Sequence, residues 1–390
     1  MKLFKEALQI EREIGDKNYQ ALCLDNIGGV YTFKGEFDDA RTYFERALEL
    51  REELKVPGNI ADTLHNLAET STKVGNYDEA LKQYLRALEL RRSAGDKRGA
   101  AIESYSLGTV FEQQGRYGAA LKSKEEALKG FRELKDRSFW LGEILSGYGH
   151  TLGQSGRNAE AEKVLNEALD IAREIRSQGL VAQTLNFLGD NASYRGDAKA
   201  AGSQFDQALK EASRTSDRAL VLLSKANVAR AVVLEKRSSE DASRSLLSRR
   251  IGSRTPDASL KKAIDALGEV GREADRLGFK YLSLECSIDL AEASLYAGDL
   301  PRAQHELERA TAQTEKLGLR TLRAKAEYLL ATKLRLAGNE IEAARHVSEA
   351  RRLLNEIGKE AQSDLVLKRA DLAPILQDSP APGGARRSKN

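Results

Sequence analysis

The sequence predicts an all-α protein built as a solenoid, in which antiparallel helix hairpins stack one after another. Seven glycines recur at a spacing of 40 or 41 residues, apart from one gap of 102 residues. An alanine follows each of these glycines after five residues, and a second alanine after twelve. Such a period is typical of one supersecondary unit that stacks on copies of itself. The glycines are Gly35, Gly75, Gly115, Gly156, Gly196, Gly298 and Gly338.

Composition supports helices rather than strands. The chain holds only six prolines in 390 residues and is 31% charged. It is rich in alanine, leucine, glutamate, lysine and arginine, which are strong helix formers. No segment alternates β-branched and polar residues in the way that a half-buried strand does.

The second unit shows how each hairpin arises. Leu64 and Leu67 begin an apolar stripe at helical spacing, which predicts the first helix of the unit. Gly75 then ends this helix, because glycine accepts the left-handed backbone conformation of a helix terminus. Ala80 and Tyr84 lie on the inner side of the second helix, where the small alanine lets the two helices approach closely.

The pattern resembles the tetratricopeptide repeat family, whose signature runs large, large, small, aromatic, Ala, aromatic, Ala. The resemblance extends over roughly residues 1–355 and implies a right-handed superhelical solenoid. The period of about 40 residues exceeds the family's commoner 34, and the closing proline of each unit is missing. In both respects the repeats are similar to those of kinesin light chains and many bacterial signalling proteins. The first unit matches the signature with Leu24, Ile27, Gly28, Tyr31, Ala40, Phe44 and Ala47.

The register of the repeats predicts how the chain is divided. Phe4 and Ala7 occupy the places of Phe44 and Ala47, so the chain begins inside a second helix and is expected to be a fragment of a longer protein. An insertion separates the two helices of the sixth unit. The predicted segments are a partial repeat (1–15), units 1–5 with the first helix of unit 6 (16–235), a Ser/Arg-rich insertion loop (236–257), the rest of unit 6 with units 7 and 8 (258–357), a C-terminal capping helix (358–377) and a disordered tail (378–390).

Charge and cysteine content narrow the class of partner. The net charge of +3 is the remainder of 62 basic and 59 acidic residues, which gives no reason to expect nucleic acid or a membrane as a partner. Cys23 and Cys286 lie on apolar helical faces, as buried cysteines of a reducing compartment do. No signal peptide or apolar run of about 18 residues is present. We therefore expect a cytoplasmic protein.

The sequence contains no constellation of catalytic or metal-binding residues. The four histidines lack metal-ligand spacing, and neither cysteine has a CxxC partner. Gly147, Gly149 and Gly153 miss the spacing of a phosphate-binding loop by one residue and lie within a first-helix pattern, which favours close helix packing. We predict a binding scaffold that is not an enzyme and holds no cofactor or metal.

The predicted ligand surface is the concave face, which the first helices line in stacked repeats. Asn26 and Asn66 occupy equivalent positions 40 residues apart. A side-chain amide donates and accepts one hydrogen bond each, so a row of amides can hold an extended peptide backbone, and the resemblance to long-repeat proteins implies this role. The row is interrupted at Ser106 and Gly147 and returns, one position earlier, as Asn186. An interhelical hydrogen bond or a solvated polar residue is the alternative.

The same face carries six acidic residues against Lys73, which predicts a basic peptide as the ligand, with a solvated face as the alternative. Leu22 and Phe33 supply apolar anchors, together with Tyr105 and Tyr194. The acidic residues are Asp25, Asp62, Glu69, Glu112, Glu143 and Asp190. The predicted peptide-binding residues are Asn26, Asn66, Asp25, Asp62, Glu69, Tyr105, Glu112, Asn186, Asp190 and Tyr194.

The leading hypothesis is a protein- or peptide-binding module of a larger signalling protein. Residues 338–375 are similar to the C-terminal ends of repeat regions attached to bacterial Ser/Thr kinases, which implies a kinase-linked protein of that kind. The alternative is a structural scaffold that self-assembles through its exposed N-terminal half-repeat. The ligand, the pathway and the oligomeric state are not readable from the sequence.

Overall fold

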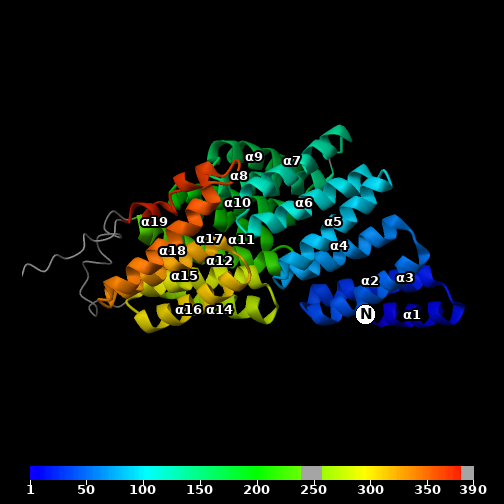
Figure 1. Cartoon of the computed structure of the whole chain (residues 1–390), viewed down its shortest axis with the longest axis horizontal. Coiled ribbons are helices and arrows are strands. Elements are labelled where there is room, and N and C mark those ends of the chain that lie inside the picture. Colours follow the sequence, from blue (N-terminus) through cyan, green and yellow to red (C-terminus); the bar gives the residue numbers. More distant parts are fainter. Residues whose placement is uncertain (137, 239–256, 379–390) are drawn as a thin grey trace, which may run out of the picture.

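The computed structural model describes residues 1–136, 138–238 and 257–378, and within these ranges every regular element is a helix. The helices form consecutive antiparallel pairs, which confirms the all-α solenoid (Figure 1). The pairs are α2 (Lys17–Lys34) with α3 (Phe37–Leu54), α4 (Pro57–Lys73) with α5 (Tyr77–Ser93), α6 (Lys97–Gln113) with α7 (Tyr117–Glu133), α8 (Phe139–Gln154) with α9 (Asn158–Glu174), α10 (Gln178–Tyr194) with α11 (Ala198–Ala212), α12 (Arg218–Ser238) with α14 (Ala258–Arg276), α15 (Lys280–Ala297) with α16 (Leu300–Lys316), and α17 (Arg320–Leu336) with α18 (Glu340–Gly358).

The turn residues define the helix boundaries as the sequence predicts. Gly35 and Gly75 end or follow the first helices of their units with φ of 78° and 84°, in the left-handed region that glycine accepts. Between units, Asp16 caps α2 by accepting hydrogen bonds from the backbone of Asn18 and Tyr19. The turn glycine and the N-cap aspartate thus set the bounds of α2.

Small residues bring the two helices of a hairpin together. Gly28 lies against the ring of Phe44, where an added Cβ would come within 2.6 Å of a ring carbon. Gly149 packs in the same way on Leu165, at 2.7 Å. The glycines that resemble a phosphate-binding loop therefore serve helix packing, and the repeated alanines such as Ala40 are fully buried.

The ends of the solenoid and its sixth unit depart from the regular pattern. An unpaired helix, α1 (Lys2–Ile14), packs on α2 through the buried Leu8. In the sixth unit α12 continues to Ser238, three residues beyond the predicted boundary, and the remainder of the predicted insertion, 239–256, lies outside the described residues.

The prediction of one C-terminal capping helix over 358–377 is wrong. After Gly358 the chain forms a 3₁₀ turn, η1 (Asp364–Lys368), and a short helix, α19 (Ala373–Gln377). Pro374 cannot donate a backbone hydrogen bond and so stands in the first turn of α19 rather than inside a longer helix. The backbone N–H of Ala370, which a continuous helix would pair within itself, donates to the carbonyl of Tyr194 at 2.8 Å. All but the first residue of the predicted tail, 378–390, falls outside the described residues.

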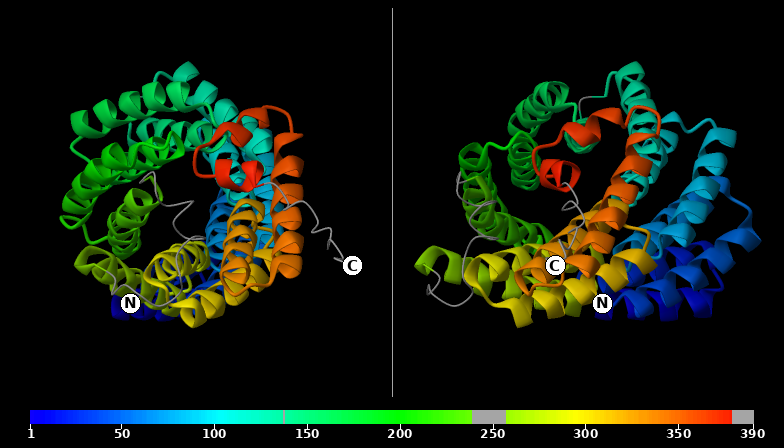
Figure 2. Two further views of the ribbon diagram at one scale, coloured as in Figure 1. Left: turned by 90° about the vertical axis from the view of Figure 1, so that its left-hand side faces the viewer. Right: turned by 60° about the vertical axis from the view of Figure 1, so that its left-hand side comes forward.

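The superhelix closes on itself after one turn. Figure 2 shows the hairpins wound into a ring with the C-terminal segment on its inner side. Elements more than 200 residues apart touch along the seam: the hydroxyls of Tyr117 and Thr321 lie 2.8 Å apart, and the rings of Phe37 and Phe279 pack edge to face at 6.2 Å. Residues 359–378, which we name the closing strap, continue this seam over the turns of units 3–5.

Candidate functional site

The structure divides the ten predicted peptide-binding residues into an open group and a closed group. The open group lies on α2 and α4, at the N-terminal part of the concave face. Asn26 is exposed and makes no hydrogen bond with any described residue, and Asn66 is partly exposed. Asp62 and Glu69 are exposed beside Asn66, although Asp62 pairs with Arg91 and Glu69 with Lys73.

The register of the repeat aligns this open group into two neighbouring stripes. On α2, Leu22, Asn26 and Phe33 follow one another at helical spacing, with the leucine 44% and the phenylalanine 76% exposed. The equivalent positions on α4, 40 residues later, are polar. They are Asp62, Asn66, Glu69 and Lys73. The apolar stripe of α2, with Asn26 at its centre, therefore lies beside the polar stripe of α4, where Asn66 occupies the equivalent position.

Asp25 belongs to the closed group although it is adjacent to Asn26 in the sequence. Its carboxylate lies 2.6 Å from the guanidinium of Arg51, and both side chains are over nine-tenths buried. Thr63 donates a hydrogen bond to it at 3.2 Å. Burial raises the pKa of Asp25 to about 6, and Arg51 opposes this rise only in part. Asp25 is thus a structural link between α2, α3 and α4.

The remaining predicted residues form a polar ladder between successive first helices. Tyr105 donates to Glu143 at 2.9 Å, across 38 residues of sequence. Asn186 is fully buried and donates to Ser224 at 2.9 Å while accepting from Asn227 at 2.8 Å. Each rung joins the first helices of adjacent units, so Asn186 makes the interhelical hydrogen bonds that were the alternative to a ligand-binding role.

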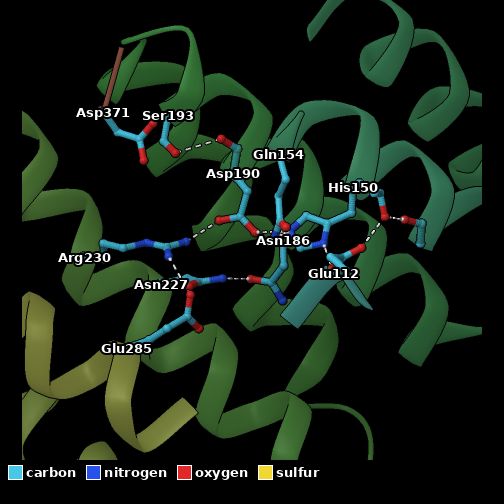
Figure 3. A network of polar contacts seen from close by, with 12 residues as sticks. Glu112, His150, Gln154, Asn186, Asp190, Ser193, Asn227, Arg230, Glu285 and Asp371 are labelled. Atoms are coloured by element: carbon cyan, nitrogen blue, oxygen red, sulfur yellow. Dashed lines mark hydrogen bonds and ion pairs between the residues drawn. The ribbon is translucent and has the colours of Figure 1, made fainter. Parts of the chain in front are cut away.

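Glu112 is the centre of the most buried part of this ladder (Figure 3). Its carboxylate accepts from Lys124 at 2.5 Å and contacts His150 Nδ1 at 2.9 Å. Lys124 also donates to the Gly147 carbonyl at 3.1 Å and to Thr151 at 2.9 Å. Burial alone would raise the pKa of Glu112, but Lys124 and His150 hold it well below its usual range.

The ladder continues from His150 through Asp190 to Arg230 and Glu285 (Figure 3). Burial disfavours the imidazolium, but the carboxylates of Glu112 and Asp190 outweigh this and raise the pKa of His150 to about 9. His150 is therefore a cation at neutral pH, and its ring stacks on Phe187 with centroids 4.0 Å apart.

Most of the acidic side chains on the first helices form ion pairs with cations of the same chain. The compensating cations come from second helices or from later units, which a count along the first helices leaves out. Arg51 of α3 neutralises Asp25, Arg91 of α5 pairs with Asp62, and Lys124 of α7 pairs with Glu112. These carboxylates therefore already have cationic partners within the chain, and the count of acidic residues does not by itself indicate a basic ligand.

Glu285 and Asp289 on α15 were missed by sequence reasoning. Glu285 lies 4.0 Å from Arg230, and Asp289 forms no ion pair with a described residue. Burial raises the pKa of Glu285 to about 7 and also raises that of Asp289. Their spacing of four residues on a first helix is visible in the sequence, but nothing local indicates that they face an enclosed interior.

Charged side chains and the closing strap line the inner side of the ring. A cavity of about 120 Å³ lies there between α12, α15, α17 and the strap. Tyr194, which was predicted as an anchor, is covered here by the guanidinium of Arg369, 3.9 Å from the ring centre. The side chains around this cavity and a second one include Arg230, Arg237, Glu285, Asp289, Glu292, Lys325 and Asp371.

The described residues contain no group of three or more metal-ligating side chains. Within the described ranges, helices long and apolar enough for a transmembrane span are absent. The side chains of the concave surface can form hydrogen bonds and ion pairs, which is typical of a repeat scaffold.

Comparison with solved structures supports the fold. The chain is similar to a Rap protein complexed with competence and sporulation factor (14% identity, 88% of this chain and 100% of that chain covered, TM-score 0.59). It is also similar to the apo form of the quorum sensor NprR from B. thuringiensis (14%, 89% and 92%, TM-score 0.54) and to apo RapI (14%, 90% and 91%, TM-score 0.50).

Sequence comparison identifies the repeat itself. No significant match is found among curated proteins. The family model described as tetratricopeptide repeat matches residues 2–53, 59–133 and 140–238, more than half of the chain. On this match, and on its stacked antiparallel hairpins, the chain belongs to the tetratricopeptide repeat family.

Proposed function

We propose that this chain is a non-catalytic scaffold that binds an extended peptide or protein segment on the concave face of α2 and α4. The observation that carries the proposal is the pair of aligned stripes on these helices. Asn26 offers an amide that has no partner among the described residues, and Leu22 and Phe33 expose apolar surface on either side of it. An extended backbone can pair with the amides while its side chains contact the apolar stripe.

The structural comparisons support a peptide or protein as the partner. A protein of this fold has been solved in complex with a competence and sporulation factor, and another is a quorum sensor. The preference for a basic partner stays a prediction. Asp62 and Glu69 are exposed beside the amides, but each already pairs with a cation of this chain.

The test is binding of peptides selected from a random display library on the wild-type protein. Asn26→Ala/Asn66→Ala removes two amides without burying a charge, and we expect it to weaken binding roughly 30-fold, since each hydrogen bond contributes about 1 kcal/mol. The control Asn166→Ala/Gln207→Ala removes two exposed amides from the second helices α9 and α11. Fluorescence anisotropy gives the dissociation constants. Equal losses in both variants, or none in the first, would refute the concave site.

Self-assembly through the N-terminal half-repeat is a second candidate, favoured by an apolar stripe on α1. Leu3, Ile10 and Ile14 lie on one side of the helix and are 78%, 53% and 68% exposed. We expect concentration-dependent dimers in sedimentation velocity, and monomers for Ile10→Glu/Ile14→Lys, which keeps the net charge. A monomeric wild-type chain at all concentrations excludes this candidate.

The link to a Ser/Thr kinase and the cytoplasmic location stay predictions. The resemblance of residues 338–375 to kinase-attached repeats supports the first, and the reducing environment expected for Cys23 and Cys286 supports the second. The genomic sequence upstream of the Met1 codon tests the link directly, through the presence or absence of a kinase domain.

A further inference from the structure

A groove of about 940 Å³ lies between α11, α12 and α14, in the sixth unit where the insertion interrupts the hairpin. Its floor is apolar, formed chiefly by Val221, Val228 and Val232 of α12 with Leu209 and Ala266 from the flanking helices. These valines lie on the side of α12 opposite Arg230, which points into the ring. The groove is therefore separate from the concave surface.

The neighbouring fifth unit buries the positions that Val228 and Val232 occupy in the groove floor. In the fifth unit Leu185, Leu188 and Ala192 are only 4%, 9% and 2% exposed. The equivalent residues of the sixth unit, 40 positions later, are the exposed Lys225 and the partly exposed Val228 and Val232. In the other units a tight glycine turn joins the two helices and fixes the distance between them. In the sixth unit the 22-residue insertion replaces this turn, so the turn does not set the distance between α12 and α14.

The rim of the groove has unpaired positive charge. Lys225, Lys262 and Arg272 are exposed and form no ion pair with any described residue. Two further arginines at the rim share one acidic partner, Glu273. The rim cations are Arg218, Lys225, Lys262, Arg272 and Arg276, against Glu269 and Glu273.

We propose that this groove docks an amphipathic helix of a partner protein, which turns apolar residues toward the valine floor and acidic residues toward the rim. An apolar channel flanked by one sign of charge is the surface that helix-in-groove recognition uses, and the rim charge selects the opposite sign in the partner. The same charge argues against the chain's own insertion as the occupant, because residues 239–256 hold four arginines and only two acidic residues.

The probe is a display library of 16-residue helical peptides, selected on the full chain in the presence of excess Lys225→Glu/Arg272→Glu protein. We expect the enriched peptides to be acidic, with apolar residues at helical spacing, and to bind this variant at least tenfold more weakly than the wild type. Ala266→Trp, which fills the groove without changing charge, is expected to cause a similar loss. Asn26→Ala/Asn66→Ala leaves this binding unchanged, so the groove is tested separately from the concave face.

The matched control is Lys82→Glu/Lys129→Glu, which makes the same charge change at lysines 77% and 78% exposed on α5 and α7. Equal weakening by this control overturns the proposal, because binding then reports net charge alone. Enrichment of neutral or basic peptides, or of none, also overturns it. Tighter binding to Leu246→Ser/Leu247→Ser would show that the insertion itself covers the groove, and the proposal would fail on that outcome too.

Discussion

Replacing Arg369 with alanine is expected to lower the free energy of unfolding by about 3–5 kcal/mol, the cost of breaking a buried ion pair from one side, and to open the ring. Arg369 is 2% exposed, and its guanidinium pairs with Asp371 through contacts of 2.7 and 3.0 Å. It also donates to the Gln154 carbonyl at 3.0 Å and covers the ring of Tyr194. One side chain thus fastens the closing strap to α8 and α10.

Two measurements check this expectation. Urea unfolding followed by circular dichroism gives the loss of stability, and small-angle X-ray scattering gives the radius of gyration, which rises if the seam opens. Arg369→Lys keeps the charge but loses the planar fork and its stacking, so we expect an intermediate loss. Arg195→Ala breaks an exposed pair with Glu162 and is expected to cost less than about 1 kcal/mol. A stable, equally compact Arg369→Ala protein would show that the strap does not hold the ring closed.

The second large effect is expected for Lys124→Met. The substitution keeps most of the apolar stem but leaves the buried Glu112 without its closest cation, which costs about 3–5 kcal/mol. Lys124 is 1% exposed and joins Glu112, Thr151 and the Gly147 carbonyl, so its loss removes three buried polar contacts at once. Chemical denaturation measures the loss.

A double variant separates the lost charge pair from lost packing. Lys124→Met/Glu112→Gln removes the buried carboxylate together with its closest cation, and we expect at least half of the stability to return. Lys129→Met, on the exposed side of the same helix, is the matched control and is expected to change stability by less than about 1 kcal/mol. If the single variant unfolds like the wild type, the ladder does not stabilise the solenoid.

Part of the candidate site follows from the repeat alone. The period places Asn26 beside Asn66 and the other residues of the α2 stripe beside those of α4, and the structure keeps these positions at the surface. The period does not say which polar side chains already have partners. Asn186 and Asp190 occupy the same face in sequence terms, yet Ser224, Asn227, His150 and Arg230 of neighbouring units engage them.

The sequence by itself determined the hairpin, its turn glycines and its stacking, because each unit of a solenoid contacts mainly its neighbours and a local period encodes those contacts. Only the tertiary structure decided that the ring closes. Closure depends on small rotations added over many units and on contacts such as Tyr117 with Thr321, which lie 204 residues apart and leave no periodic signal. The path of residues 359–378 has both kinds of cause. Pro374 prevents one continuous helix, whereas the packing of the strap on the turns of units 3–5 depends on the closed ring, which brings those turns beside it.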